Sequence, residues 1–146
     1  DYSYIHYSMD FRKFFSIKNE KNVLGLQVAA NFMSGASIPF YNLQKIAGNT
    51  RLRGIANANL YVDRQAFWVQ AEYRRKLFWR FGGVAFAGLG EVASSMDKFT
   101  FHGLKYVVGL GGRFQALKDE KLNVRIDAGL GPDGQHAFYF SIKEAF

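Results

Sequence analysis

Hydrophobic and polar residues alternate with a period of two along most of the chain, which is the pattern of β-strands with two unlike faces. In residues 23–33, for example, Leu24, Leu26 and Val28 share one face, and Gln27 and Asn31 share the other. About seven stretches are long enough to cross a membrane as strands, which takes roughly nine residues each. They are residues 2–15, 23–33, 66–77, 81–92, 104–117, 122–130 and 136–146. The pattern predicts an all-β antiparallel meander of about seven or eight strands.

The two faces also indicate which side of the sheet meets water. A soluble barrel or sandwich would turn its apolar face inward, but two observations favour the reverse. The polar face mixes arginine with acids, as a wet or ion-paired lumen does. The connections also alternate between short (18–22, 78–80, 118–121) and long (34–65, 93–103), as periplasmic turns and extracellular loops do. We therefore expect an antiparallel transmembrane β-barrel, and a soluble basic ligand-binding β-barrel is a less favoured alternative.

The last predicted strand, residues 136–146, places Phe138, Phe140, Ile142 and Phe146 on one face. In a transmembrane barrel, aromatic strand ends lie at the membrane interface. An apolar strand that ends on an aromatic residue resembles the assembly signal of bacterial outer-membrane proteins. We interpret these four residues as a terminal assembly strand.

Composition narrows the class of protein. A chain of 146 residues normally forms one domain, so we treat residues 1–146 as a unit. It is 49% hydrophobic, yet no run approaches the roughly 18 apolar residues of a membrane helix. An aromatic content of 17% and fifteen glycines suit a barrel with interfacial girdles and bent strands. The absence of cysteine excludes disulfide and thiol chemistry. An exported chain without a signal peptide is expected to be mature or partial.

The net charge of +7 raises nucleic-acid binding as a rival function. The lysines, however, fall in predicted turns and the arginines recur singly on polar strand faces, so no continuous basic stripe forms. We expect no nucleic-acid partner. The three histidines lack metal-ligand spacing, so no metal site or cofactor is expected. The glycines of residues 109–112 precede no helix, and strand bending explains them better than a phosphate-binding loop.

The longest connection, residues 34–65, has no obvious strand or helix pattern. Loops of this length are usually functional or disordered. This one keeps many apolar side chains, among them Ile46, Leu52 and Ile55, which gives it surface to pack with. We expect an ordered loop that folds inward.

Residues 49–55 of this loop, Asn-Thr-Arg-Leu-Arg-Gly-Ile, resemble the (V/L)RG(F/Y) motif of the sixth extracellular loop in the BamA/TamA outer-membrane superfamily (bacterial surface antigen). Residues 70–74, 82–88, 125–131 and 138–146 follow in the order that this superfamily shows. The resemblance covers essentially the whole chain. It implies the C-terminal portion of a sixteen-stranded barrel in the bacterial outer membrane.

Carried over to this sequence, Arg53 matches the motif arginine, Gly54 its glycine, and Ile55 stands where an aromatic is usual. The family arginine reaches into the lumen and pairs with acids on barrel strands, and Glu72 and Asp127 match such acids here. Independently of the family, a guanidinium has five donors and keeps its charge, so a buried one needs carboxylates in reach. We predict that Arg53 binds Glu72 or Asp127.

Two positions depart from the family pattern. Gly88 stands where many members have an aspartate, which removes one expected partner of the loop arginine. Lys143 replaces a glycine that is common near the end of the terminal strand, which bears on how loosely that strand pairs. Glu72 and Asp127 could also form a glycosidase-like carboxylate dyad, but with Arg53 as their neutralising partner we expect no catalysis.

The resemblance implies a protein that assists insertion or translocation of other proteins at the outer membrane, without nucleotide or cofactor. Its partners would be membrane lipids, client outer-membrane or secreted proteins, and the missing part of its own barrel or further protein chains. A passive outer-membrane pore or structural barrel is the alternative. Because single-chain bacterial barrels have even strand counts and open edges are costly in lipid, we expect that this chain does not close a barrel alone.

Overall fold

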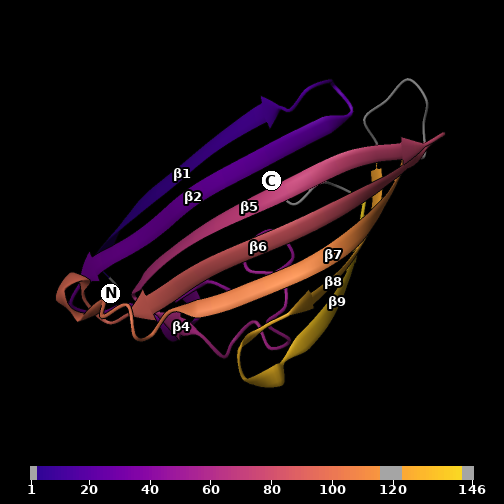
Figure 1. Cartoon of the computed structure of the whole chain (residues 1–146). Coiled ribbons are helices and arrows are strands. Elements are labelled where there is room, and N and C mark those ends of the chain that lie inside the picture. Colours follow the sequence, from indigo (N-terminus) through magenta and orange to yellow (C-terminus); the bar gives the residue numbers. More distant parts are fainter. Residues whose placement is uncertain (1–2, 116–122, 143–146) are drawn as a thin grey trace.

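The computed structural model describes residues 3–115 and 123–142, and most of them belong to one antiparallel sheet (Figure 1). Its seven strands pair in chain order, so the predicted seven-stranded meander is confirmed. The strands are β1 (Tyr4–Ser16), β2 (Asn22–Gly35), β5 (Gln65–Phe78), β6 (Phe81–Ala93), β7 (Lys105–Gln115), β8 (Asn123–Leu130) and β9 (His136–Ser141). Within the described residues, no helix is long and apolar enough to span a membrane.

Most strand boundaries lie close to the predicted ones, because the alternating pattern persists until a turn begins. The predicted ends at residues 2, 117 and 122, the turn at 118–121 and the last four residues, 143–146, lie outside the described residues. Phe146 and Lys143 are among them.

The connections separate the two ends of the sheet. The hairpins β1–β2 and β5–β6 turn at one end, while residues 36–64 and 94–104 connect strands at the other (Figure 1). The second of these longer connections contains the short helix η2 (Met96–Lys98). At the same end, β8 and β9 are joined by a tight turn with the helix η3 (Pro132–Gly134). The predicted alternation of short and long connections therefore does not extend to this last hairpin.

Residues 36–64 fold into the curve of the sheet (Figure 1). They contain the helix η1 (Phe40–Asn42) and a small ladder of β3 (Gln44–Lys45) with β4 (Val62–Asp63), which are too short to produce a periodic signal in the sequence. Ile46, Leu52 and Ile55 of this loop are fully buried. They form the hydrophobic core with residues of the sheet, namely Ala29, Ala66, Trp68 and Val107. The loop is ordered and folded inward, as its apolar content predicts.

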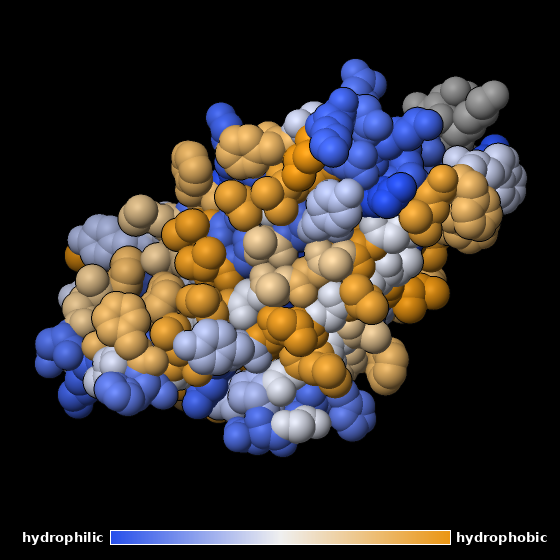
Figure 2. Space-filling model, viewed as in Figure 1, coloured by the Kyte–Doolittle hydropathy of each residue, from blue (hydrophilic) through white to orange (hydrophobic). Residues whose placement is uncertain are grey.

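The side of the sheet that this loop covers, here called the inner face, carries the apolar core residues named above together with most of the buried polar and charged side chains of the sheet. Its buried side chains include Gln27, Asn31, Gln70, Glu72, Arg113, Arg125 and Asp127. The opposite, outer face exposes large apolar residues, such as Leu26, Val28, Tyr106, Leu110, Ile126 and Phe138. Figure 2 shows hydrophobic side chains across the middle of the outer face and hydrophilic ones toward its ends. This arrangement is the inverse of a soluble sheet, which buries its apolar face.

The sheet is open at both sides. In the part of the chain that the structure describes, β1 pairs only with β2, and β9 pairs only with β8, so the sheet does not close into a barrel. Every residue of β1 is exposed on both faces. Its inner-face residues still follow the pattern of the sheet, because His6 bonds Asn31 and Asp10 accepts from Gln27.

Candidate functional site

The candidate site is the place where the loop motif meets the inner face of the sheet. Gly54 has a φ of 137°, a conformation that L side chains rarely adopt. A Cβ at Gly54 would lie 2.7 Å from the carbonyl oxygen of Leu130 on β8, and a Cβ at Gly129 would lie 2.4 Å from the oxygen of Arg53. Glycine on both sides therefore allows the two backbones to touch. This backbone contact with β8 fixes the position of the Arg53 side chain along the inner face of the sheet.

Arg53 is fully buried and lies between the two carboxylates that the sequence singles out. Its Nη1 donates to Asp127 Oδ2 at 2.8 Å, and its Nη2 forms an ion pair with Glu72 Oε2. All three side chains have no exposed area. Both predicted partners are thus in contact with the motif arginine, although they come from β5 and β8.

A ring completes the environment of this guanidinium. The Cζ atom of Arg53 lies 3.7 Å from the centroid of Phe86 on β6. Phe86 in turn lies over Gly109 of β7, where an added Cβ would be 2.2 Å from the ring. Cation–π contact of this kind stabilises a desolvated arginine. Gly109 therefore makes room for the ring, a reason for glycine that the sequence analysis did not identify.

Three further inner-face arginines surround the same carboxylates, and the sequence pattern did not predict this cluster. Arg74 Nε lies 2.5 Å from Glu72 Oε1, and Arg113 Nη1 lies 2.5 Å from Asp127 Oδ1. Arg125 Nε lies 3.3 Å from Asp127 Oδ2. We call these four arginines and two carboxylates the inner-face cluster. It is richer in positive than in negative charge, which is costly in a buried place.

Some buried arginine nitrogens of the cluster also lack a hydrogen-bond acceptor, in line with its excess of positive charge. Within the described residues, the buried atoms Arg53 Nε and Arg125 Nη1 have no hydrogen-bond partner. Nearly all buried polar atoms in folded proteins have a partner. The arginines of the cluster therefore offer more donors than its two carboxylates accept.

Other contacts hold the rest of the loop against the sheet. Gln70 Nε2 donates to the oxygen of Thr50 at 3.1 Å, and Arg125 Nη2 donates to the oxygen of Asn49 at 2.7 Å. Tyr139 Oη of β9 donates to the oxygen of Ile55 at 3.1 Å. Three strands thus bind the backbone of the motif directly. No periodic signal predicts them, because the acceptors are backbone atoms.

Arg51 lies two residues before Arg53 in the same stretch, 49–55, and has different contacts. It donates to the oxygen of Lys45 within the loop, and its Cζ lies 4.9 Å from the ring centroid of Trp68. Burial lowers the pKa of Arg51, because desolvation disfavours its charged form. Among the described residues no carboxylate pairs with Arg51, so it is not part of the inner-face cluster.

The packing of the loop against the sheet explains why position 88 is a glycine in this chain. A Cβ there would lie 2.7 Å from Leu52 Cδ2 and 3.2 Å from the Cβ of Gln70. The buried side chain of Leu52 takes the space that an aspartate at position 88 would need. Position 88 therefore makes an apolar contact between loop and sheet and does not supply an acidic partner for Arg53.

β9 (His136–Ser141) is the first part of the predicted terminal strand, whose last four residues lie outside the described residues. Phe138, Phe140 and Ile142 are exposed on the outer side, at 75%, 70% and 52%. Tyr139 points inward to the loop motif. Phe138, Phe140 and Ile142 lie on the face opposite to the inner-face cluster, so they form a second, separate feature at one edge of the sheet; Phe146 lies outside the described residues.

The chemistry of the site is electrostatic and structural. In residues 3–115 and 123–142, no group of three or more histidine, aspartate or glutamate side chains is arranged to hold a metal ion. Comparison with protein-family models and with curated proteins finds no match to this chain. What is established is therefore an all-β chain whose open antiparallel sheet buries a charged inner face around an inserted loop.

Proposed function

We propose that this chain is part of an outer-membrane β-barrel of BamA/TamA type, which assists insertion or translocation of other proteins at the outer membrane. One observation carries the proposal. The loop with the Arg-Gly motif lies on the inner face of the sheet, with Arg53 fully buried between Glu72 and Asp127. This is the arrangement that the resemblance implies.

The inverted sheet supports a membrane location. Leu110 and Ile126, in the middle of the outer face, are exposed to 68% and 57%. A contiguous apolar surface of this kind would be an aggregation hazard in water, whereas lipid covers it favourably. The buried polar inner face corresponds to the polar interior of a transmembrane barrel.

The open edges support a role in handling client strands. β1 and β9 each have one side without a neighbour among the described residues, and unpaired backbone groups cost several kcal/mol each in lipid. The missing part of the barrel or further protein chains would cover them. In the proposed mechanism the terminal strand forms a weak seam, and a client strand adds to it by β-augmentation. The loop with Arg53 braces the interior meanwhile.

An ordered, buried loop favours this function over a passive pore. A loop packed into the interior leaves less room for solutes, and here Ile46, Leu52 and Arg53 of the loop have no exposed area. A soluble basic ligand-binding barrel is disfavoured by the exposed outer face. Both alternatives remain outcomes of the experiments below.

Membrane location is tested by cysteine accessibility, because residues 1–146 contain no cysteine and any cysteine elsewhere in the reading frame can be replaced by serine. We would produce the protein from its complete reading frame in vesicles, with Leu110→Cys on the outer face and Met96→Cys in η2 as the control. A membrane-impermeant maleimide should label Met96→Cys and leave Leu110→Cys unlabelled until the protein is unfolded. Equal labelling of the folded variants in vesicles would support the soluble barrel instead.

Client handling is tested by folding and crosslinking in the same vesicles. An unfolded outer-membrane protein should fold faster than in empty vesicles, followed by its heat-modifiable mobility. Cysteine at Phe138 or Phe140 on β9 should crosslink to the client, whereas cysteine at Ala85 on the central strand β6 should not. Client folding at the rate of empty vesicles would indicate a passive barrel and refute the proposal.

A further inference from the structure

The hairpin of β8 and β9 is in direct contact with the loop that carries the Arg-Gly motif. Tyr139 Oη of β9 donates to the oxygen of Ile55 at 3.1 Å. In the turn before β9, Gln135 Nε2 donates to Tyr61 Oη at 3.4 Å. Ile55 and Tyr61 both belong to the inward-folded loop, whereas Figure 1 shows β8 and β9 at one margin of the sheet. The last described strand is therefore tied to the loop by side chains.

The register of this hairpin places Tyr139 next to the inner-face cluster. Tyr139 lies directly opposite Asp127 in the β8–β9 ladder, and Asp127 accepts a hydrogen bond from Arg53. Gly54, the next residue of the loop, lies against the backbone of β8. Arg53, Gly54 and Ile55 are thus held in turn by a side chain of β8, the backbone of β8 and a side chain of β9. A shift of β9 against β8 would be transmitted to the loop at Ile55.

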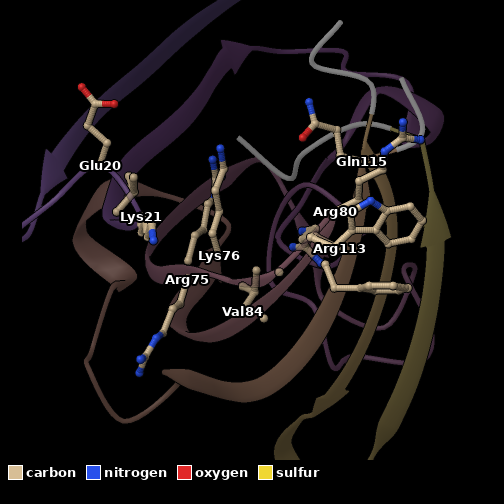
Figure 3. Close-up of a pocket in the computed structure, with 14 residues that line it drawn as sticks. Glu20, Lys21, Arg75, Lys76, Arg80, Val84, Arg113 and Gln115 are labelled. Atoms are coloured by element: carbon tan, nitrogen blue, oxygen red, sulfur yellow. The ribbon is translucent and has the colours of Figure 1, made fainter. Parts of the chain in front are cut away.

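β8 is held more firmly than β9. β8 pairs with strands on both sides, whereas β9 has β8 as its one neighbour among the described strands. Arg113 of β7 also donates to Asp127 of β8 at 2.5 Å, and Figure 3 shows Arg113 beside the cavity at the end of the sheet where the short hairpins turn. Arg125 of β8 donates to the oxygen of Asn49 in the loop at 2.7 Å. β9 is therefore the strand of the hairpin that can move while β8 stays in place.

The hydroxyl of Tyr139 is the group that links β9 to Ile55. The neighbouring residues Phe138 and Phe140 are exposed on the outer face, while Tyr139 is half-buried on the inner face. Within the described residues, this hydroxyl bonds no group other than the oxygen of Ile55. A phenylalanine would fill the same space and leave that oxygen without its donor. One hydroxyl therefore decides whether β9 is hydrogen-bonded to the motif.

We propose that Tyr139 is a positioning residue that couples the terminal strand to the loop motif. Its hydrogen bond to Ile55 holds β9 in the closed position of the seam. Displacement of β9 by a client strand breaks this bond and loosens the loop at Ile55. Coupling of this kind is reciprocal, so an ordered loop also opposes opening of the seam. The inference rests on the proposed function, but the coupling itself can be measured without a client.

The test is hydrogen exchange of the protein from its complete reading frame in lipid vesicles, measured by mass spectrometry on peptides that contain residues 49–55 and 136–141. The variant is Tyr139→Phe. Its matched control is Tyr106→Phe on the outer face of β7, which removes the same hydroxyl from a residue that is 61% exposed. Circular dichroism verifies that both variants are folded. The rate of client folding is measured with the same proteins.

Loss of one hydrogen bond shifts a local opening equilibrium about fivefold. We therefore expect the amides of both segments to exchange about fivefold faster in Tyr139→Phe and at the parent rate in Tyr106→Phe. Client folding should also become up to about fivefold faster in Tyr139→Phe, because the seam opens more often. A hydrogen bond that only supports the fold would leave client folding unchanged or, when lost, slow it.

Unchanged exchange, faster exchange in one segment alone, or equal changes in the two variants would overturn the coupling. So would slower or unchanged client folding in Tyr139→Phe when the parent handles clients. A parent that handles no client, with both segments responding to Tyr139→Phe, would refute the proposed function alone.

Discussion

Replacing Arg53 with alanine is the most direct test of the inner-face cluster. The change removes the only loop cation between Glu72 and Asp127, and all three side chains are fully buried. Breaking a buried ion pair by removing one partner costs about 3–5 kcal/mol, because the remaining charge stays buried. The contact with Phe86 adds about 1–2 kcal/mol when desolvated.

The remaining arginines reduce this cost. Glu72 keeps Arg74 at 2.5 Å, and Asp127 keeps Arg113 at 2.5 Å, so neither carboxylate becomes wholly unpaired. We therefore expect Arg53→Ala to lower the free energy of unfolding by about 3–5 kcal/mol in total, and not by the larger sum of separate contacts. Arg53→Lys should recover only part of the loss, because an ammonium lacks the guanidinium fork.

The assay is urea unfolding in lipid vesicles, followed by heat-modifiable mobility. Arg12→Ala is the matched control, because Arg12 also pairs with an acid, Asp10, but both side chains are substantially exposed. Exposed pairs contribute about 0–1 kcal/mol, so this variant should unfold almost as the parent does. If Arg53→Ala and Arg12→Ala shift the unfolding midpoint equally, the inner-face cluster does not stabilise the fold.

Three further predictions concern the loop and the outer face. Gly129→Ala should destabilise the protein by more than 1 kcal/mol and expose the loop to protease, because its Cβ would lie 2.4 Å from the oxygen of Arg53. Gly112→Ala on the next strand meets nothing within 4 Å and should be nearly neutral; equal protease sensitivity of the two would contradict the close contact. Tyr139→Phe should cost about 1 kcal/mol of unfolding free energy, since it loses the hydrogen bond to Ile55, whereas Tyr106→Phe on the outer face should be silent. Ile126→Arg on the outer face should cost about 2–4 kcal/mol of folding free energy in vesicles, while Met96→Arg in η2 should fold normally; normal folding of both would argue against lipid contact at position 126.

The strands and their faces follow from the sequence because they are local properties. Alternation with a period of two assigns each side chain of β2 or β8 to a face without reference to any other strand. The pairing of Arg53 with Glu72 or Asp127 was also predicted, from the resemblance of residues 49–55 to the loop motif and from the need of a buried guanidinium for carboxylates.

Other features depend on residues that are distant in sequence and meet only in the folded sheet. Arg53 and Asp127 are 74 residues apart, and the register of β7 and β8 decides that Arg113 and Arg125 join them. The reason for glycine at positions 88 and 109 is visible only in the folded structure, where the side chains of Leu52 and Phe86 occupy the space that a Cβ would need.

The contact between Lys21 and Lys76 has the same origin. Lys21 lies in the turn before β2 and Lys76 lies in β5, and the backbone hydrogen bond from Lys76 to Lys21 brings these two distant positions together. The sequence by itself determined the strands, their two faces and the inward direction of the loop, because local periodicity and composition encode them. The tertiary structure alone decided that Arg74, Arg113 and Arg125 share the site of Arg53, Glu72 and Asp127, because strand register is set by long-range hydrogen bonding and packing.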